Sequence, residues 1–102
     1  MDVVISVSGV KIRLPEERWQ HIIEEHPELI DLRYEILDTV KSPNTIFGGS
    51  AGELLAVREL VADKFLIVVY RELNKDDGFI ITAFLIRKVK QLERRQVLWP
   101  LQ

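Results

Sequence analysis

The sequence predicts a single α+β domain in which two helices pack on one face of an antiparallel sheet of about four strands. Two observations predict this fold. Apolar residues recur at helical spacing from Trp19 to about residue 41, and beyond Pro43 they recur with the period of two that is typical of strands. A chain of 102 residues has the length of one ordinary domain, so we expect residues 1–102 to form one unit.

The first half of the chain predicts a short strand pair followed by two helices. Residues 3–14 alternate apolar and polar on either side of a glycine, as in two strands joined by a tight turn or in one bent strand. Pro15 suits the first turn of a helix, and Pro27 disfavours helical backbone at the residue before it. The first helix should therefore end near Glu25, and a second should run from Pro27 to about Lys41.

The second half of the chain predicts the sheet. Four segments are rich in β-branched or aromatic residues and are separated by the turn-forming stretches GGSAG, VAD and NKDDG. The segments read TIF, ELLAVREL, KFLIVVYREL and GFIITAFLIRK. Such short strands with tight connections predict an antiparallel meander.

The register of these strands predicts two different sheet faces, because alternate residues point to opposite sides. One face is wholly apolar and should meet the helices; it collects Leu55, Val57, Phe65, Ile67, Val69, Phe79, Ile81, Ala83 and Leu85. The other face holds three polar residues among apolar ones; it collects Leu54, Ala56, Arg58, Leu66, Val68, Tyr70, Ile80, Thr82 and Phe84. Arg58, Tyr70 and Thr82 are therefore candidates for function.

Composition excludes several classes of protein. The chain has no cysteine, which excludes disulfides, thiolate nucleophiles and zinc sites with sulfur ligands. No apolar run approaches the roughly 18 residues of a membrane span, and no signal peptide is recognisable, so we expect a cytoplasmic protein without membrane contact. The net charge of −2 does not indicate nucleic-acid binding, but residues 87–95 hold five bases and one acid. That run is either a solvated surface or a patch that faces phosphate.

The two histidines, His21 and His26, lie five residues apart in the first helical segment. Five residues of helix separate two side chains by roughly 140°, so the rings do not converge on a metal ion, and we expect neither a metal site nor a cofactor. His26 lies on the apolar side just before Pro27, where a buried side chain can cap the second helix. His21 lies on the polar side, as a plain surface histidine or as an available acid or base.

A metal-free set of polar residues remains, and it suits cleavage of RNA by its own 2′-hydroxyl. That reaction needs a group to take the hydroxyl proton, cations to stabilise charge on the phosphate, and a proton for the leaving oxygen. The residues available for these tasks are His21, His26, Arg58, Tyr70, Thr82 and Lys88.

The order of motifs also resembles a known group of proteins. "LPEERWQHIIEEHPEL", a helix ending in "SPN", and then "ELLAVREL", "FLIVVYRE" and "GFIITAFL" resemble small bacterial and phage-associated domains of the barnase, EndoU, colicin and RelE nuclease superfamily, over nearly the whole chain. The resemblance implies a barnase- or RelE-like fold and an RNase role. It falls on His21, His26, Arg58 and Thr82 as catalytic residues and, less closely, on Lys88.

Together these features predict a toxin-like, metal-independent endoribonuclease that uses no cofactor. His21 would act as acid or base, Arg58 and Lys88 would hold phosphate, and Tyr70 would contact the substrate. The expected partners are RNA and an antitoxin or another protein. Two alternatives stay open: a non-catalytic module that binds protein or nucleic acid on the same fold, and a homodimer formed through the mixed sheet face.

Overall fold

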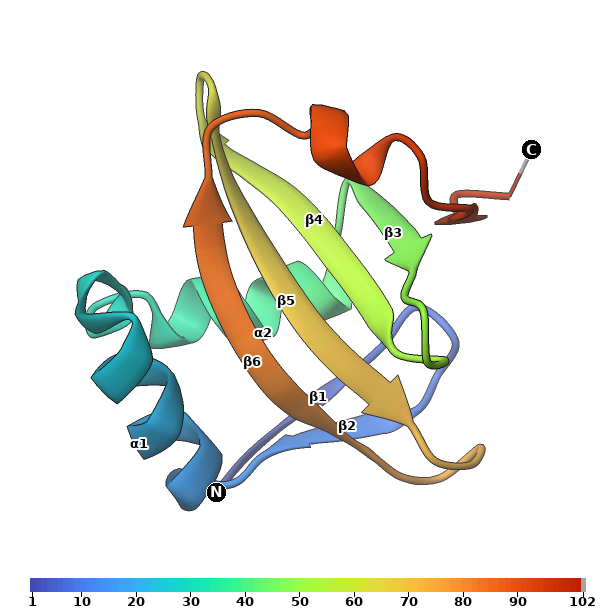
Figure 1. The fold of residues 1–102 in the computed structure, drawn as a ribbon. Coiled ribbons are helices and arrows are strands. Elements are labelled where there is room, and N and C mark those ends of the chain that lie inside the picture. Colours follow the sequence, from blue (N-terminus) through green and yellow to red (C-terminus); the bar gives the residue numbers. More distant parts are fainter. Residues whose placement is uncertain (102) are drawn as a thin grey trace.

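The computed structural model describes residues 1–101, apart from the side chain of Gln91. In chain order its elements are β1 (Asp2–Ile5), β2 (Lys11–Leu14), α1 (Glu16–Glu25), η1 (Pro27–Leu29), α2 (Arg33–Lys41), β3 (Thr45–Gly48), β4 (Leu54–Val61), β5 (Lys64–Glu72), β6 (Gly78–Ile86), η2 (Lys90–Leu92) and β7 (Val97–Trp99). The strands form one sheet in the order β1-β2-β6-β5-β4-β3-β7, with α2 behind it and α1 beside β6 (Figure 1). No helix of these residues is both long and apolar enough to cross a membrane.

The predicted antiparallel sheet of about four strands is wrong in both number and direction. The sheet has seven strands, and β2 runs parallel to β6, with Ile12 opposite Gly78 and Arg13 opposite Phe79. The added strands are β1 and β2 at one end and β7 at the other. Pairing between segments so far apart in the chain leaves no trace in local periodicity. The two-helix α+β class is confirmed, as are the antiparallel meander from β3 to β6 and the pairing of β1 with β2.

The first predicted helix has the expected end, but the second predicted helix is not continuous. α1 ends at Glu25, as Pro27 predicts, but the expected second helix is divided into the single turn η1 and the helix α2. Leu29 in η1 and Ile36 in α2 are both fully buried. Periodicity does not distinguish one continuous helix from two segments that bury the same side.

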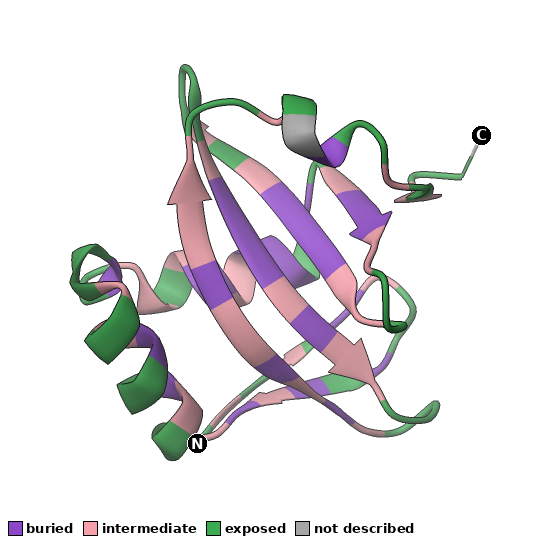
Figure 2. Cartoon of the chain, in the orientation of Figure 1, coloured by how far each residue is buried: buried purple, intermediate pink, exposed green. Residues whose placement is uncertain are grey.

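The helices lie on the other side of the sheet from the one predicted. Ile22 of α1 and Ile36 of α2 pack in one cluster with Leu66 and Val68 of β5, whereas Ile67 belongs to a separate cluster on the far side. The coloured ribbon shows buried residues along the central strands as well as on the helices (Figure 2). Because both sides of the central strands are apolar, alternation alone does not decide which one the helices cover.

An irregularity in β6 also changes the predicted faces. Tyr70 pairs with Ile80 and Val69 pairs with Thr82, so Ile81 is an extra residue in β6 with no partner in β5. A bulge of this kind exchanges the two sides of a strand beyond it. Thr82 and Phe84 therefore lie on the side away from the helices, where the regular register would not place them.

Arg33 links the N-terminal strand β1 to both helices by hydrogen bonds. Arg33 at the start of α2 donates to Asp2 of β1 at 2.6 Å and to Glu16 of α1 at 2.7 Å. Its guanidinium also lies over the ring of Trp19, 5.2 Å from the ring centroid. The hydrogen bond from Arg33 lowers the pKa of Glu16. This group of contacts positions α1 and α2 relative to the edge strand.

A second ion pair joins β2 to the β5–β6 loop, and it predicts a change in acid stability. Arg13 donates to Asp77 through Nε at 2.8 Å and through Nη2 at 3.0 Å, which lowers the pKa of Asp77. The stabilisation is present above the unfolded pKa of about 4 and is lost as the pH falls through the lowered pKa. We therefore expect the melting temperature of Asp77→Asn to fall less steeply than that of the wild type between pH 5 and pH 2.

Circular dichroism melts from pH 7 to pH 2 measure this difference. Asp76→Asn is the matched control, because Asp76 is an exposed neighbour in the same loop and makes no ion pair within residues 1–101. Its melting temperature should fall with decreasing pH in the same way as that of the wild type. If the melting temperatures of wild type and Asp77→Asn fall equally steeply between pH 5 and pH 2, the pair does not have the role given to it.

Candidate functional site

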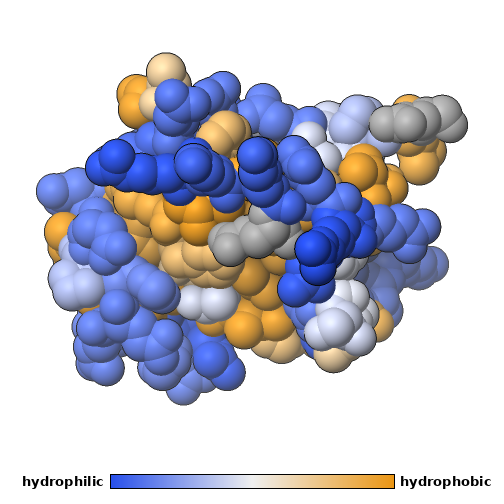
Figure 3. Space-filling model, turned by 45° about the horizontal axis from the view of Figure 1, so that its top comes forward, coloured by the Kyte–Doolittle hydropathy of each residue, from blue (hydrophilic) through white to orange (hydrophobic). Residues whose placement is uncertain are grey.

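The side of the sheet away from the helices is only partly covered. We define the open face as this surface, made by five buried and five half-buried apolar residues: Phe47, Leu55, Val57, Ile67 and Leu92, with Phe65, Val69, Phe84, Ile86 and Val89 packed on them. Leu92 and Val89 come from the segment after β6, which folds back over part of the face (Figure 1). The space-filling view shows apolar residues in a hollow bordered by hydrophilic side chains (Figure 3).

An aromatic side chain and a histidine meet at the edge of the open face. The ring centroids of Phe84 and His26 are 6.3 Å apart, with the ring planes inclined by 39°. Phe84 reaches this side because of the bulge at Ile81, and His26 reaches it because α1 ends beside β6. The pair places an imidazole next to an apolar surface that is open to solvent on one side.

His26 does not cap the second helical segment with its side chain, so that prediction is wrong. Its backbone N–H donates to Ile22 O at 2.7 Å, and its carbonyl accepts from Leu29 N–H at 3.0 Å. No side-chain hydrogen bond caps η1. Main-chain groups thus satisfy the helix ends, and the half-buried imidazole is left to pack against Phe84.

Thr82 lies two residues before Phe84 in β6, and its hydroxyl is buried. Thr82 Oγ1 has no hydrogen-bond partner among the described residues. Native structures rarely leave a buried hydroxyl unpaired without a reason. Thr82 lies on the same side of β6 as Phe84, the residue against which His26 packs.

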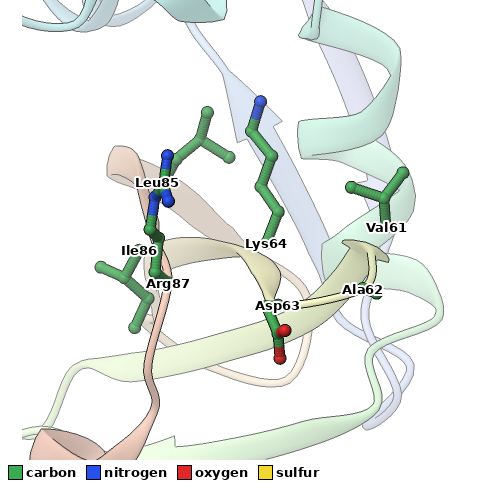
Figure 4. Close-up of a pocket in the computed structure, with 7 residues that line it drawn as sticks. All are labelled: Val61, Ala62, Asp63, Lys64, Leu85, Ile86 and Arg87. Atoms are coloured by element: carbon green, nitrogen blue, oxygen red, sulfur yellow. The ribbon is translucent and has the colours of Figure 1, made fainter.

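Cations gather where β5 begins and β6 ends. Lys64 and Arg87 line a cavity of about 540 Å³ together with Val61 and Leu85. Because Leu85 packs in the cluster beneath the helices, this cavity lies at this end of β5 and β6 on the helix side of the sheet. In the close-up, the side chains of Lys64 and Arg87 point the same way, whereas the carboxylate of Asp63 points away from them (Figure 4). Neither cation makes an ion pair within residues 1–101. Their charge is available to an anion.

The basic run predicted to face solvent or phosphate continues from this cavity. Lys88 and Lys90 are exposed, as is Arg94, while the Arg95 guanidinium donates to Gly48 O at 3.5 Å. The run thus follows the border of the open face from β6 to β3. Lys64 was not singled out from the sequence, because nothing local links it to a run more than twenty residues later.

Arg58 and Tyr70 lie on the helix side of the sheet. The Arg58 guanidinium forms an ion pair with Asp38 of α2 and donates to Ser42 O at 3.2 Å. Its charge is therefore balanced by a contact that fastens α2 to β4. Tyr70 has no exposed surface, and burial together with the charge of Glu72 raises the pKa of its phenol.

His21 is accessible, as predicted. Its side chain is 50% exposed on α1, and its Nε2 lies 2.8 Å from Oε1 of Glu25, one turn further along the helix. This is the contact expected of a surface pair at i, i+4. The prediction that the two histidines occupy different environments is confirmed.

The six predicted residues therefore do not converge on one point. His26 and Thr82 border the open face, His21 projects from α1, and Arg58 and Tyr70 lie across the sheet. Lys88 belongs to the basic rim, by which we mean the exposed cations after β6: Arg87, Lys88, Lys90 and Arg94. Among the described residues, no three histidine or acidic side chains gather as metal ligands. The arrangement at the open face offers stacking surfaces, one imidazole and several free cations. Comparison of the chain with protein-family models, curated proteins and solved structures found no match.

Proposed function

We propose that the chain is an RNA-binding domain that holds single-stranded RNA across the open face. The observation that carries this proposal is the half-buried aromatic surface of Phe65 and Phe84 beside a rim of unpaired cations. Proteins that bind single strands combine these two features, because bases stack on aromatic rings while cations neutralise the backbone. The proposal keeps RNA as the partner and the cytoplasm as the location predicted from the sequence.

The distribution of charge supports RNA at this surface in spite of the net charge of −2. Residues 87–95 carry five bases and one acid, and Lys64 adds a cation at the cavity beside Arg87. A phosphate in that cavity would meet two cations, Lys64 and Arg87, and one acidic residue, Asp63, whose carboxylate points away from them (Figure 4). A strand bound at the exposed Lys88, which follows Ile86 at the border of the open face, would place its bases over Phe84 and His26. Local charge, rather than net charge, decides where a polyanion binds.

Charge reversal at the rim tests the proposal. The double variant Arg87→Glu/Lys88→Glu is expected to bind a fluorescent single-stranded RNA at least tenfold more weakly than the wild type, because two phosphate contacts become repulsive. The slope of log K against log salt should decrease by about 1.4 if two contacts are lost. Fluorescence anisotropy at 50 and 200 mM salt measures both quantities.

Lys11→Glu/Lys75→Glu is the matched control, with the same change of net charge. Lys11 and Lys75 are exposed at the opposite end of the sheet, near the β5–β6 loop. The control should retain most of the affinity. If both double variants lose RNA affinity equally, binding responds to net charge alone. If RNA binding is saturable and neither variant alters it, the RNA binds elsewhere on the protein.

Metal-independent cleavage of the bound RNA is the second candidate, and the position of His26 favours it. In this reaction a base removes the proton of the 2′-hydroxyl, that oxygen bonds to phosphorus, and the bond to the 5′ oxygen breaks as it takes a proton. His26 is the acid or base beside the open face, and His21 is the more accessible imidazole on the same helix.

Incubation with RNA in EDTA, followed by analysis of product ends, tests the cleavage candidate. Products with 2′,3′-cyclic phosphate are expected, and loss of the responsible histidine should slow cleavage by about 100-fold or more. His26→Ala and His21→Ala identify which histidine acts, and RNA affinity measured in parallel separates catalysis from binding. If the wild type yields no cyclic-phosphate ends, the domain is a binding module only.

A further inference from the structure

A second cavity lies on the helix side of the sheet, at the end of β5 away from Lys64. It has a volume of about 380 Å³, within the range of small-molecule sites. Its walls include apolar side chains from β4 and from the C-terminal segment, together with two polar side chains from β5: Leu54, Leu98, Trp99, Leu101, Tyr70 and Glu72. Neither the open face nor its basic rim contributes to it.

Tyr70 is the unexplained residue of this cavity. It has no exposed surface, and its hydroxyl has no hydrogen-bond partner in the described part of the chain. Phenylalanine would fill the same space without burying an unpaired polar atom, which destabilises a fold. A tyrosine that forms part of a cavity wall in this state indicates that a bound molecule supplies the missing partner.

Glu72 provides a second polar group on the same side of β5. Its Oε2 accepts from the Ser6 hydroxyl at 2.7 Å, which orients the carboxylate, and its Oε1 makes no hydrogen bond within residues 1–101. The negative charge of Glu72 acts on the Tyr70 phenol together with burial, and both raise its pKa. The phenol therefore offers a hydrogen-bond donor, and the side-chain oxygens of Glu72 offer an acceptor.

We propose that this cavity binds a small uncharged molecule that carries a carboxamide or lactam group on an aromatic or aliphatic body. The carbonyl oxygen of the ligand accepts from Tyr70, and its N–H donates to Glu72. The body packs against Leu98 and Trp99, which close the cavity from the C-terminal side. A carboxylate of the same shape is disfavoured, because it would face Glu72 and lack the N–H.

Titration of the ¹⁵N-labelled protein with benzamide and with 2-pyridone tests this site. We expect saturable shifts of the Trp99 indole N–H, while that of Trp19, which is buried beneath Arg33, stays in place. Benzoate, the carboxylate counterpart of benzamide, should bind at least tenfold more weakly. Tyr70→Phe should weaken benzamide binding by about tenfold, as expected when one hydrogen bond is lost.

Two further variants make the test decisive. Tyr34→Phe removes the hydroxyl of a tyrosine that is exposed on α2, and it should leave benzamide binding unchanged. Glu72→Gln keeps a carbonyl acceptor but removes the charge, so it should reduce the difference in affinity between benzamide and benzoate. The melting temperature of Tyr70→Phe without ligand should equal or exceed that of the wild type, which shows that the variant is folded.

Three results would overturn the proposal: no saturable shift of the wild type with either amide, equal benzamide affinity in Tyr70→Phe and wild type, or shifts confined to residues outside this cavity. None of them depends on RNA. Failure of this site and failure of RNA binding at the open face are therefore distinguishable.

Discussion

Replacing Gly78 with alanine is expected to lower the free energy of unfolding by about 3 kcal/mol, at the upper end of the usual cost of overpacking. A Cβ at this position would collide with the carbonyl oxygen of Arg71 and would lie 2.6 Å from Cδ1 of Ile12. The first obstacle is backbone of the paired strand β5, which cannot move aside without opening the β5–β6 ladder. The second belongs to β2, so the parallel pairing of β2 with β6 should loosen as well.

Urea denaturation followed by circular dichroism measures this loss. Gly9→Ala is the matched control: Gly9 lies in the β1–β2 turn at φ +83° with nothing within 4 Å of an added Cβ. It should cost only about 1 kcal/mol, the strain of a left-handed alanine. If Gly78→Ala is no more destabilising than Gly9→Ala, the close approach of β2 to the β5–β6 hairpin does not hold in solution.

Replacing Trp19 with alanine is expected to cost about 3 to 5 kcal/mol of stability, the usual range for a buried tryptophan. Trp19 is 6% exposed and belongs to the cluster between the helices and the sheet. Its ring also supports the Arg33 guanidinium, which binds Asp2 and Glu16. Truncation therefore leaves a cavity under α1 and removes the surface on which this arginine rests.

His21→Ala on the same helix is the control for Trp19→Ala. Its side chain is half exposed and makes only the surface contact with Glu25, so the change should cost within about 0.5 kcal/mol. Thermal and urea denaturation of both variants give the comparison. A His21→Ala variant as unstable as Trp19→Ala would mean that the orientation of α1 on the sheet is wrong.

Local signals predicted several elements because their causes lie within a few residues. Pro15 and Pro27 bound α1, and the turn-rich stretches GGSAG and NKDDG separate β3 from β4 and β5 from β6. The exposure of His21 followed from its place on the polar side of a helix. Each of these inferences depends on side-chain sterics or on a helical period, which neighbouring residues alone determine.

Residue type alone named six candidate residues but did not predict how they are arranged. His26 packs against Phe84, and Thr82 lies on the same side of β6. Arg58 was grouped with Thr82 because a regular register puts them on one side. The extra residue Ile81 in β6 separates them, and no motif in the sequence marks this bulge.

The local sequence determined which segments are helices or strands, and it determined the concentration of positive charge in residues 87–95. Tertiary structure alone decided three things: that the helices cover the Leu66 and Val68 side, that β2 pairs in parallel with β6, and that a cavity forms around Tyr70. The physical reason is the same for each. The central strands are apolar on both sides, so the choice depends on burial and backbone pairing between residues far apart in the chain, which sequence periodicity does not record.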